Sequence, residues 1–315
     1  MISHWDDART WRGERGHIAG TWSDLTGEST RAVGLTRIRV DPGMWSTPLH
    51  LEGAEEEIFY VLGGSGISVQ REGGETRAYE VGKGDCLVHL ALENAHTLQA
   101  GPEGLDVLAF GERSLAGGVT LIPRAGVSWL GASWVRVGAE QDHPWTAEAA
   151  IGPPSVDEIS PRPANIVNAA DVEAAERVMT TVGRRLRLLS AAAGSQRTGL
   201  RHCEVLPGML NAAPHCHSAE EEIFVVVDGS GHLVLWEGAG VVEHPVRSGS
   251  VVARAPGTGV AHSFRGGDGG MMLLMYGTRD PDDLCFYPRS RKLFIRGLGL
   301  IVRVDEQLDY WEGED

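Results

Sequence analysis

The sequence predicts an all-β protein built from two copies of one unit. Short apolar or β-branched runs recur at close spacing along the chain, and Gly-rich turns such as GGSG, DGSG and GGDGG separate them. Glycine accounts for 42 of the 315 residues, nearly twice its usual share of about 7%, which favours tight turns between short strands. Together these features indicate two β-sandwiches or β-barrels in one chain.

An internal duplication accounts for the two copies. GLTRIRVDPGM, which begins at Gly34, returns as GLRHCEVLPGM from Gly199, and HLEGAEEEIFYVLGGSG from His50 returns as HCHSAEEEIFVVVDGSG from His215, both at an offset of 165 residues. An offset that stays constant over such distances indicates a duplicated domain. We therefore expect a first domain over residues 1–150, and a linker with a second domain over residues 151–315, each of ordinary size.

The segment that joins the two copies has its own composition. Residues 146–165 contain four prolines and little apolar periodicity, which is typical of a linker. After it, Ala169–Val178 gives the best short helical pattern, and Asp6–Trp11 occupies the matching place in the first copy. We therefore expect short helices in the N-terminal and inter-domain segments, beside the strands.

Charge and composition disfavour several classes of partner. The chain has 28 Lys and Arg against 43 Asp and Glu, a formal net charge of −15, without a basic cluster, which disfavours nucleic acid and anionic membranes. It has no apolar run of about 20 residues and no signal-like stretch near its first residue. Four cysteines lie far apart without a CxxC pair, so a reducing, cytoplasmic setting is the simplest expectation.

The second copy holds the densest set of chemically active side chains, in the segment PHCHSAEEE. His215 and His217 share one face if the segment is a strand, because alternate residues of a strand do so. Glu222 can rejoin that face only if residues 218–221 form a turn, and a third imidazole, His262, follows another turn-rich segment. Three imidazoles and a carboxylate suit Mn, Fe, Ni, Cu or Zn, and suit Ca or Mg poorly.

The spacing of these residues resembles the two sequence motifs of the cupin superfamily, and the duplication resembles a bicupin with two type-2 cupin barrels. The first motif matches Gly208, His215, His217, Glu222 and Gly229, and the second matches Gly249, Pro256, Gly259 and His262. The resemblance implies one jelly-roll β-barrel per copy. It also implies a divalent transition metal held by His215, His217, Glu222 and His262, with Glu222 as the candidate catalytic residue, either as a ligand or as a proton shuttle.

The first copy keeps fewer of the matching residues. His50, Glu57 and His96 correspond to His215, Glu222 and His262, but Glu52 replaces the second imidazole. Two imidazoles and two carboxylates could hold a second cation, or the barrel could be kept for packing, with its polar groups satisfying one another.

Three further residue groups near these motifs carry their own expectations. The lone position of His89 favours a structural role. Glu55 and Glu56, like Glu220 and Glu221, are expected to be solvated turn residues.

The function that these features favour is a metal-dependent enzyme, dioxygenase-like or an isomerase or lyase. Three neutral imidazoles and one carboxylate around a divalent ion leave a charge of about +1, which favours a small oxygenated or anionic ligand. The alternative is a non-catalytic small-ligand or metal-binding sensor. Because Glu52 replaces an imidazole, an oxalate-decarboxylase-like role is disfavoured. We expect the two barrels to pair within the chain through their edge strands, and a homodimer is the other assembly that edge pairing would allow.

Overall fold

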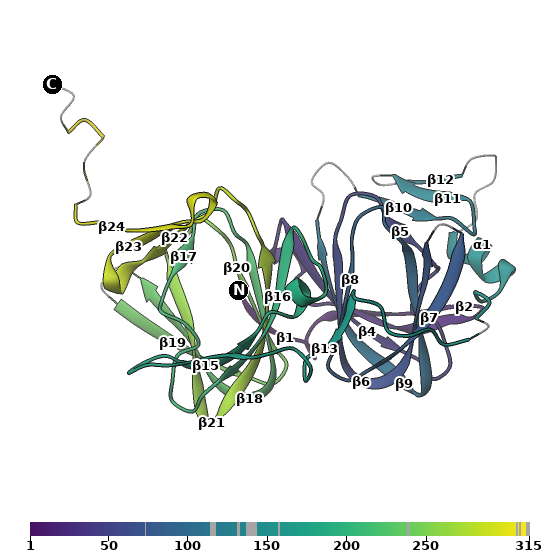
Figure 1. Ribbon diagram of the computed structural model, residues 1–315, viewed down its shortest axis with the longest axis horizontal. Coiled ribbons are helices and arrows are strands. Elements are labelled where there is room, and N and C mark those ends of the chain that lie inside the picture. Colours follow the sequence, from purple (N-terminus) through teal and green to yellow (C-terminus); the bar gives the residue numbers. More distant parts are fainter. Residues whose placement is uncertain are drawn as a thin grey trace.

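The computed structural model shows two β-barrels side by side, the first copy at the right of Figure 1 and the second at the left. The structure describes residues 1–72, 74–113, 118–130, 133–136, 144–156, 158–237, 240–306, 308 and 310–312. Each barrel consists of one eight-stranded and one four-stranded antiparallel sheet. The all-β, two-barrel prediction is therefore confirmed, and the shape follows from short strands separated by glycine-rich turns.

The first barrel has the strand order β13-β8-β6-β9-β4-β3-β2, with β7 beside β6, and a small sheet in the order β12-β11-β10-β5. Its strands are β2 (Arg9–Arg15), β3 (Ile18–Asp24), β4 (Val33–Val40), β5 (Leu51–Glu52), β6 (Glu57–Glu72), β7 (Glu75–Gly82), β8 (Asp85–His89), β9 (Ala95–Glu112), β10 (Val119–Ile122), β11 (Val127–Leu130), β12 (Ser133–Arg136) and β13 (Ile166–Asn168).

The second barrel repeats this plan in the order β1-β20-β18-β21-β16-β15-β14, with β19 beside β18, and a small sheet in the order β17-β22-β23-β24. Its strands are β1 (Ile2–His4), β14 (Ala175–Val178), β15 (Gly183–Arg187), β16 (Thr198–Val205), β17 (Cys216–His217), β18 (Glu222–Glu237), β19 (Gly240–Arg247), β20 (Ser250–Arg254), β21 (Ala261–Thr278), β22 (Leu284–Tyr287), β23 (Lys292–Ile295) and β24 (Leu300–Arg303).

Helices are few and short among the described residues. They are α1 (Pro144–Ile151), α2 (Leu189–Ala192), and the 3-10 turns η1 (Gly27–Ser29), η2 (Pro288–Ser290) and η3 (Arg296–Leu298). None of the helices in the described part of the chain has the length and apolarity needed to span a membrane.

The prediction of helices over Ala169–Val178 and Asp6–Trp11 is wrong. The end of the segment Ala169–Val178 forms β14, which pairs with β15 from Val178 opposite Gly183, and Asp6–Trp11 leads into β2. A helix of about ten residues is marginal by itself, and here β15 and β3 offer neighbouring strands with which residues 175–178 and 9–11 pair instead. The inter-domain helix is α1 instead, at the start of the Pro-rich segment.

The barrels exchange their first strands. The N-terminal strand β1 pairs with β20 of the second barrel, with Ile2 opposite Val252. The inter-domain strand β13 pairs with β8 of the first barrel, with Ile166 opposite Leu87. Each copy thus adds its first strand to the edge of the other barrel's large sheet, which covers an edge that would otherwise present unpaired backbone groups.

An apolar core lies between the barrels, in addition to the core inside each one. It combines residues of both copies, among them Val33, Leu35, Ile58, Tyr60, Val88, Phe110, Leu200, Ile223, Val225, Val251, Leu274 and Tyr276. Alternation along β18 explains the division: Ile223 and Val225 face this shared core, whereas Phe224 and Val226 fill the second barrel. The barrels therefore share one continuous packed interface.

Two carboxylates expected to be solvated are buried at this interface. Glu56 is 1% exposed and accepts hydrogen bonds from Ser195 Oγ at 2.7 Å and from the backbone N–H of Gln196 at 2.8 Å and of Thr198 at 3.1 Å. At the duplicated position, Glu221 accepts backbone N–H groups of the first copy. The expectation is therefore wrong for Glu56 and Glu221, because each serves as the acceptor for a loop of the other barrel. It is also wrong for Glu220, which is buried and accepts a hydrogen bond from Arg296 of its own barrel.

Candidate metal centres

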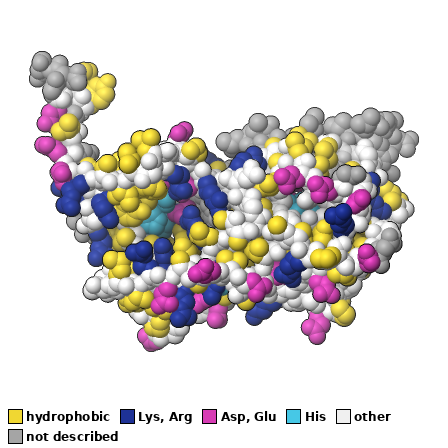
Figure 2. Space-filling view, viewed as in Figure 1, with side chains coloured by type: hydrophobic (Ala, Val, Ile, Leu, Met, Phe, Trp, Pro, Cys, Tyr) yellow, Lys and Arg dark blue, Asp and Glu magenta, His cyan; other side chains and the backbone are white. Residues whose placement is uncertain are grey.

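The second barrel brings together the four residues that the motifs single out. His217 lies in β17, Glu222 is the first residue of β18, and His262 is the second residue of β21. His215 forms an isolated bridge to His262. Residues 218–221 form a bend, as expected from the alternation of side chains along a strand, so Glu222 returns to the same side as the imidazoles. Figure 2 shows histidine side chains at the floor of a hollow in this lobe.

The side chains converge on one small volume. Glu222 Oε2 lies 3.1 Å from His262 Nε2 and 3.6 Å from His217 Nε2. The ring centroids of His215 and His262 are 4.9 Å apart. Ligand atoms of His215, Glu222 and His262 all lie within 4.8 Å of one another, a spread compatible with a single bound ion.

Two atoms of this cluster lack a hydrogen bond. Glu222 Oε2 and His262 Nε2 are both buried and make no hydrogen bond of good geometry with any described residue, although they face each other. A buried carboxylate oxygen without a donor is costly. A divalent cation bound to both atoms would remove that cost, so the donor set fits a metal ion.

Neighbouring groups orient two of the imidazoles. His215 Nδ1 lies 2.8 Å from the carbonyl oxygen of Ala213, and His217 Nδ1 lies 2.7 Å from Asp283 Oδ2. Each contact places the ring proton on Nδ1, so the unprotonated Nε2 keeps a lone pair that can bind a metal. Proteins commonly support metal-binding histidines in this way. Asp283 also accepts the backbone N–H groups of residues 218–220, so it fixes the bend and the imidazole together.

The protonation states agree with this arrangement. Burial, together with the charge of His262, lowers the pKa of His215 to about 3. Burial also disfavours the charged form of His217, but Asp283 and Glu222 outweigh burial and raise its pKa. Burial alone would raise the pKa of Glu222; the contact with His262 and the other imidazoles lower it instead. A carboxylate and a neutral His215 are therefore ready to act as ligands.

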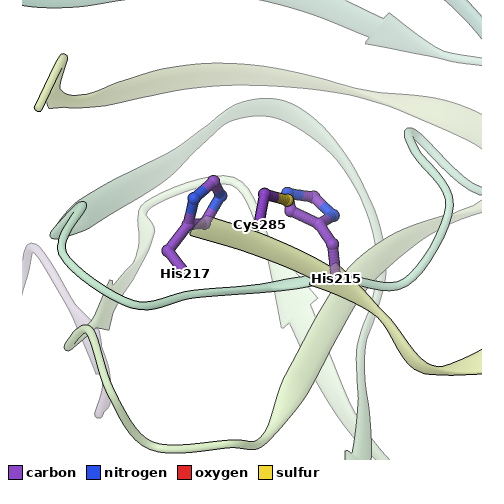
Figure 3. A group of neighbouring side chains, drawn as sticks. All are labelled: His215, His217 and Cys285. Carbon is purple, nitrogen blue, oxygen red and sulfur yellow. The ribbon is translucent and has the colours of Figure 1, made fainter. Parts of the chain in front are cut away.

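A thiol that the sequence analysis did not single out lies against the cluster. Cys285, on β22, stands directly opposite His217 in the strand register. Its sulfur and ligand atoms of His215 and His217 lie within 4.8 Å of one another, and Figure 3 shows the three side chains facing a common space. Burial raises the pKa of Cys285 to about 12, and a hydrogen bond with Tyr287 opposes part of that increase. No local motif marks this residue, because strand pairing brings it to the site.

A partly buried arginine also stands beside the cluster. Arg254, the last residue of β20, is directly opposite Glu222 in the register. Two residues earlier on the same face, Val252 packs in the interior of the second barrel. The Nε atom of Arg254 is buried without a hydrogen-bond partner among the described residues, and burial lowers its pKa while Glu222 opposes that change. In the first barrel, His89 occupies the matching position opposite Glu57.

The first barrel places its corresponding residues together but pairs them with one another. Glu57 Oε2 lies 3.0 Å from His96 Nε2 in a hydrogen bond, and 3.4 Å from His50 Nε2. Ligand atoms of these three residues also lie within 4.8 Å of one another. Glu52 is held to one side by Thr120, whose hydroxyl donates to both of its oxygens at 2.9 Å.

The charges of the first cluster compensate internally. Burial disfavours the charged form of His50, but Glu57 and Glu52 outweigh it and raise its pKa to about 9. Burial and the charge of Glu57 raise the pKa of Glu52 to about 7. His89 stacks on His96 with ring centroids 3.7 Å apart. The cluster can thus balance its charges without an ion, because a charged His50 faces the carboxylate of Glu57.

Two paired β-barrels, each with a cluster of imidazoles and carboxylates, agree with the fold that the motif resemblance implied. No protein-family model matches the sequence, and no curated protein matches it. Among solved structures, the chain is similar to Bacillus subtilis oxalate decarboxylase at pH 4.6, with 16% identity, a TM-score of 0.60, and coverage of 88% of this chain and 75% of the other. It is also similar to the formate complex of Lactobacillus farciminis oxalate decarboxylase, with 14% identity, a TM-score of 0.59, and coverage of 90% and 87%. At these identities the likeness shows the shared fold.

Proposed function

We propose that the protein is a metal-dependent enzyme that acts on a small anionic molecule in the second barrel. The observation that carries the proposal is the buried pair Glu222 Oε2 and His262 Nε2, which converge without a hydrogen bond. His215, His217, Glu222 and His262 would hold the ion. A bound divalent transition metal would supply a Lewis acid that polarises a substrate oxygen. Bacillus subtilis oxalate decarboxylase, which shares this fold, has Mn(II) centres, and this supports Mn as the first ion to test.

The charge around the site supports an anionic substrate. The three imidazoles and one carboxylate leave a divalent ion with a charge of about +1, and Arg254 adds a partly buried cation with a buried Nε atom opposite Glu222. A guanidinium with a free N–H suits a carboxylate oxygen. We infer that Arg254 orients the substrate carboxylate, while Glu222 serves as a ligand or as a proton shuttle.

The first barrel is proposed to bind an ion weakly. Its cluster of His50, Glu57 and His96 satisfies its own hydrogen bonds, so an ion must displace existing contacts, and Glu52 would have to leave Thr120. We also propose residues 1–150 and 151–315 as the two sequence units, in a cytoplasmic setting supported by four free cysteines.

The test begins with metal content. Protein reconstituted with Mn²⁺ or Co²⁺ should retain about one equivalent after dialysis, and the double variant H215A/H217A should lose it. The matched variant H50A, at the duplicated position, should retain it. Finding no stoichiometric metal in the reconstituted wild type would overturn the proposal.

Turnover then separates an enzyme from a sensor. The loaded protein is incubated with oxalate and other small carboxylates and enols, with and without oxygen, and products are measured. We expect turnover of an anionic compound and its loss in R254M. Tight binding of a carboxylate without turnover across the panel would instead favour the non-catalytic alternative.

A further inference from the structure

We propose that Cys285 is an additional ligand of the ion in the second barrel and binds it as a thiolate. The inference rests on the proposed metal site and specifies its chemistry. It implies a site of imidazole, carboxylate and sulfur donors, which prefers softer ions than imidazoles and a carboxylate alone would prefer. The thiolate also lowers the net charge of the site with a divalent ion from about +1 to about zero, so that Arg254 carries the positive charge that an anionic substrate would meet.

The position of the sulfur carries the inference. Ligands that bind one ion at about 2.0–2.3 Å are separated by about 3–4.5 Å. Cys285 and ligand atoms of His215 and His217 are within 4.8 Å of one another, which is close to the separation that binding to one ion requires. Cys285 is 2% exposed, and His215 is shared with a second group, which contains the unpartnered Glu222 Oε2 and His262 Nε2.

The strand that carries Cys285 is built to face the cluster. Alternate residues of a strand share one face, and Asp283, Cys285 and Tyr287 alternate at β22. Asp283 binds His217 Nδ1, and the ring of Tyr287 stacks on His215 with centroids 5.7 Å apart. The residues on either side of Cys285 therefore both contact imidazoles of the cluster, and the sulfur lies between them.

The first barrel provides an internal comparison. Thr120 occupies the position that corresponds to Cys285, and it stands opposite Glu52 as Cys285 stands opposite His217. The threonine hydroxyl is engaged by Glu52, so this barrel offers oxygen where the second offers sulfur. The duplication has thus produced one harder and one softer donor set in the same fold.

The chemistry of binding is a simple exchange. The thiol loses its proton to water as the sulfur joins the ion, and no electron is transferred.

Cobalt provides the test, because thiolate coordination to Co²⁺ gives a near-ultraviolet charge-transfer absorption that imidazole and carboxylate ligands do not give. Full-length protein is loaded with Co²⁺, its bound cobalt is counted by dialysis, and its spectrum is recorded. We expect the absorption in the wild type, its complete loss in C285S, and its persistence in C216S. Cys216 is the matched control, since it is adjacent to His217 but pairs with Phe286.

The outcomes separate this inference from the proposed function. Bound cobalt without the absorption, or an absorption that survives C285S, would overturn the thiolate ligand and leave the metal site intact. Absence of bound cobalt would overturn both. Competition between Co²⁺ and Mn²⁺ gives a second readout: C285S should reduce the preference for Co²⁺ by about tenfold or more, and an unchanged preference would contradict the inference.

Discussion

Glu56 joins the two barrels, and its replacement by alanine tests how much this contact stabilises the chain. Its carboxylate accepts hydrogen bonds from the loop that leads into β16, at residues 195–198. Replacement removes the acceptor but leaves the donors in place. The cost therefore depends on which donors can reach water afterwards.

The structure allows the magnitude to be worked out. Thr198 is fully buried and donates both its N–H and its hydroxyl to Glu56, whereas Ser195 Oγ keeps a second acceptor at Thr198 O. Gln196 and Arg197 are exposed, so their N–H groups can turn to water. Two orphaned buried donors at about 1–3 kcal/mol each give a loss of about 4 kcal/mol.

Glu221 occupies the corresponding position in the second copy, and its replacement by alanine should reduce stability less than Glu56→Ala does. It accepts the N–H groups of Arg31, Ala32 and Val33, of which only Val33 is fully buried. One orphaned donor corresponds to about 2 kcal/mol. Glu56→Ala should therefore destabilise the protein about twice as much as Glu221→Ala.

Urea unfolding at pH 7 and calorimetry measure both losses, with Glu93→Ala as an exposed carboxylate control that changes stability by no more than about 0.5 kcal/mol. At about 2 °C per kcal/mol for a chain of this size, Glu56→Ala should lower Tm by about 8 °C. A loss below about 1 kcal/mol for Glu56→Ala, or a larger loss for Glu221→Ala, would refute the reasoning.

Two further predictions concern the second barrel. Asp283→Asn should weaken Co²⁺ binding by about 10–100-fold, because it removes the carboxylate that orients His217. Equilibrium dialysis measures the Co²⁺ affinity, with Asp282→Asn, at an exposed neighbouring position, as the control. Equal affinities of the two variants would contradict the prediction. His202 is buried on β16, and burial followed by the charge of Arg187 lowers its pKa. The unfolded chain takes up this proton near pH 6.5, so stability should fall as pH decreases below about 6.5. In urea unfolding between pH 7 and 5, the free energy of unfolding should depend less on pH in His202→Gln than in the wild type. An unchanged pH dependence would show that other groups cause the loss of stability.

Local rules predicted the parts of the candidate site that depend on nearby residues. Strand parity placed His215 and His217 on one side, and it required the bend at 218–221 that returns Glu222 to them. Arg254 and Cys285 were not predicted, because they reach the cluster through the register of β20 and β22. A register is fixed by tertiary pairing, which neither spacing nor composition records.

The same reason explains which features of the fold were missed. Turn residues and apolar runs indicate strands, but β1 and β13 are three residues long, too short for a periodic pattern. Their exchange between barrels depends on free sheet edges far away in sequence. The interface carboxylates Glu56 and Glu221 were missed likewise, since an acidic turn residue looks the same whether water or a neighbouring loop supplies the donors.

The exchanged strands lead to the last prediction, that the halves 1–150 and 165–315 are not stable monomers when separated. The first half loses β13 and leaves the edge of β8 unpaired; the second keeps β13 but loses β1 and leaves the edge of β20 unpaired. Each half also exposes its side of the shared apolar core, and a free edge beside an apolar face promotes association. We expect aggregation or self-association of each half in light scattering, and a 1:1 complex on co-expression, because both strands and both faces then regain their partners. Two well-behaved monomers that do not bind each other would show that the exchanged strands and the shared core contribute little, and that the barrels are merely tethered.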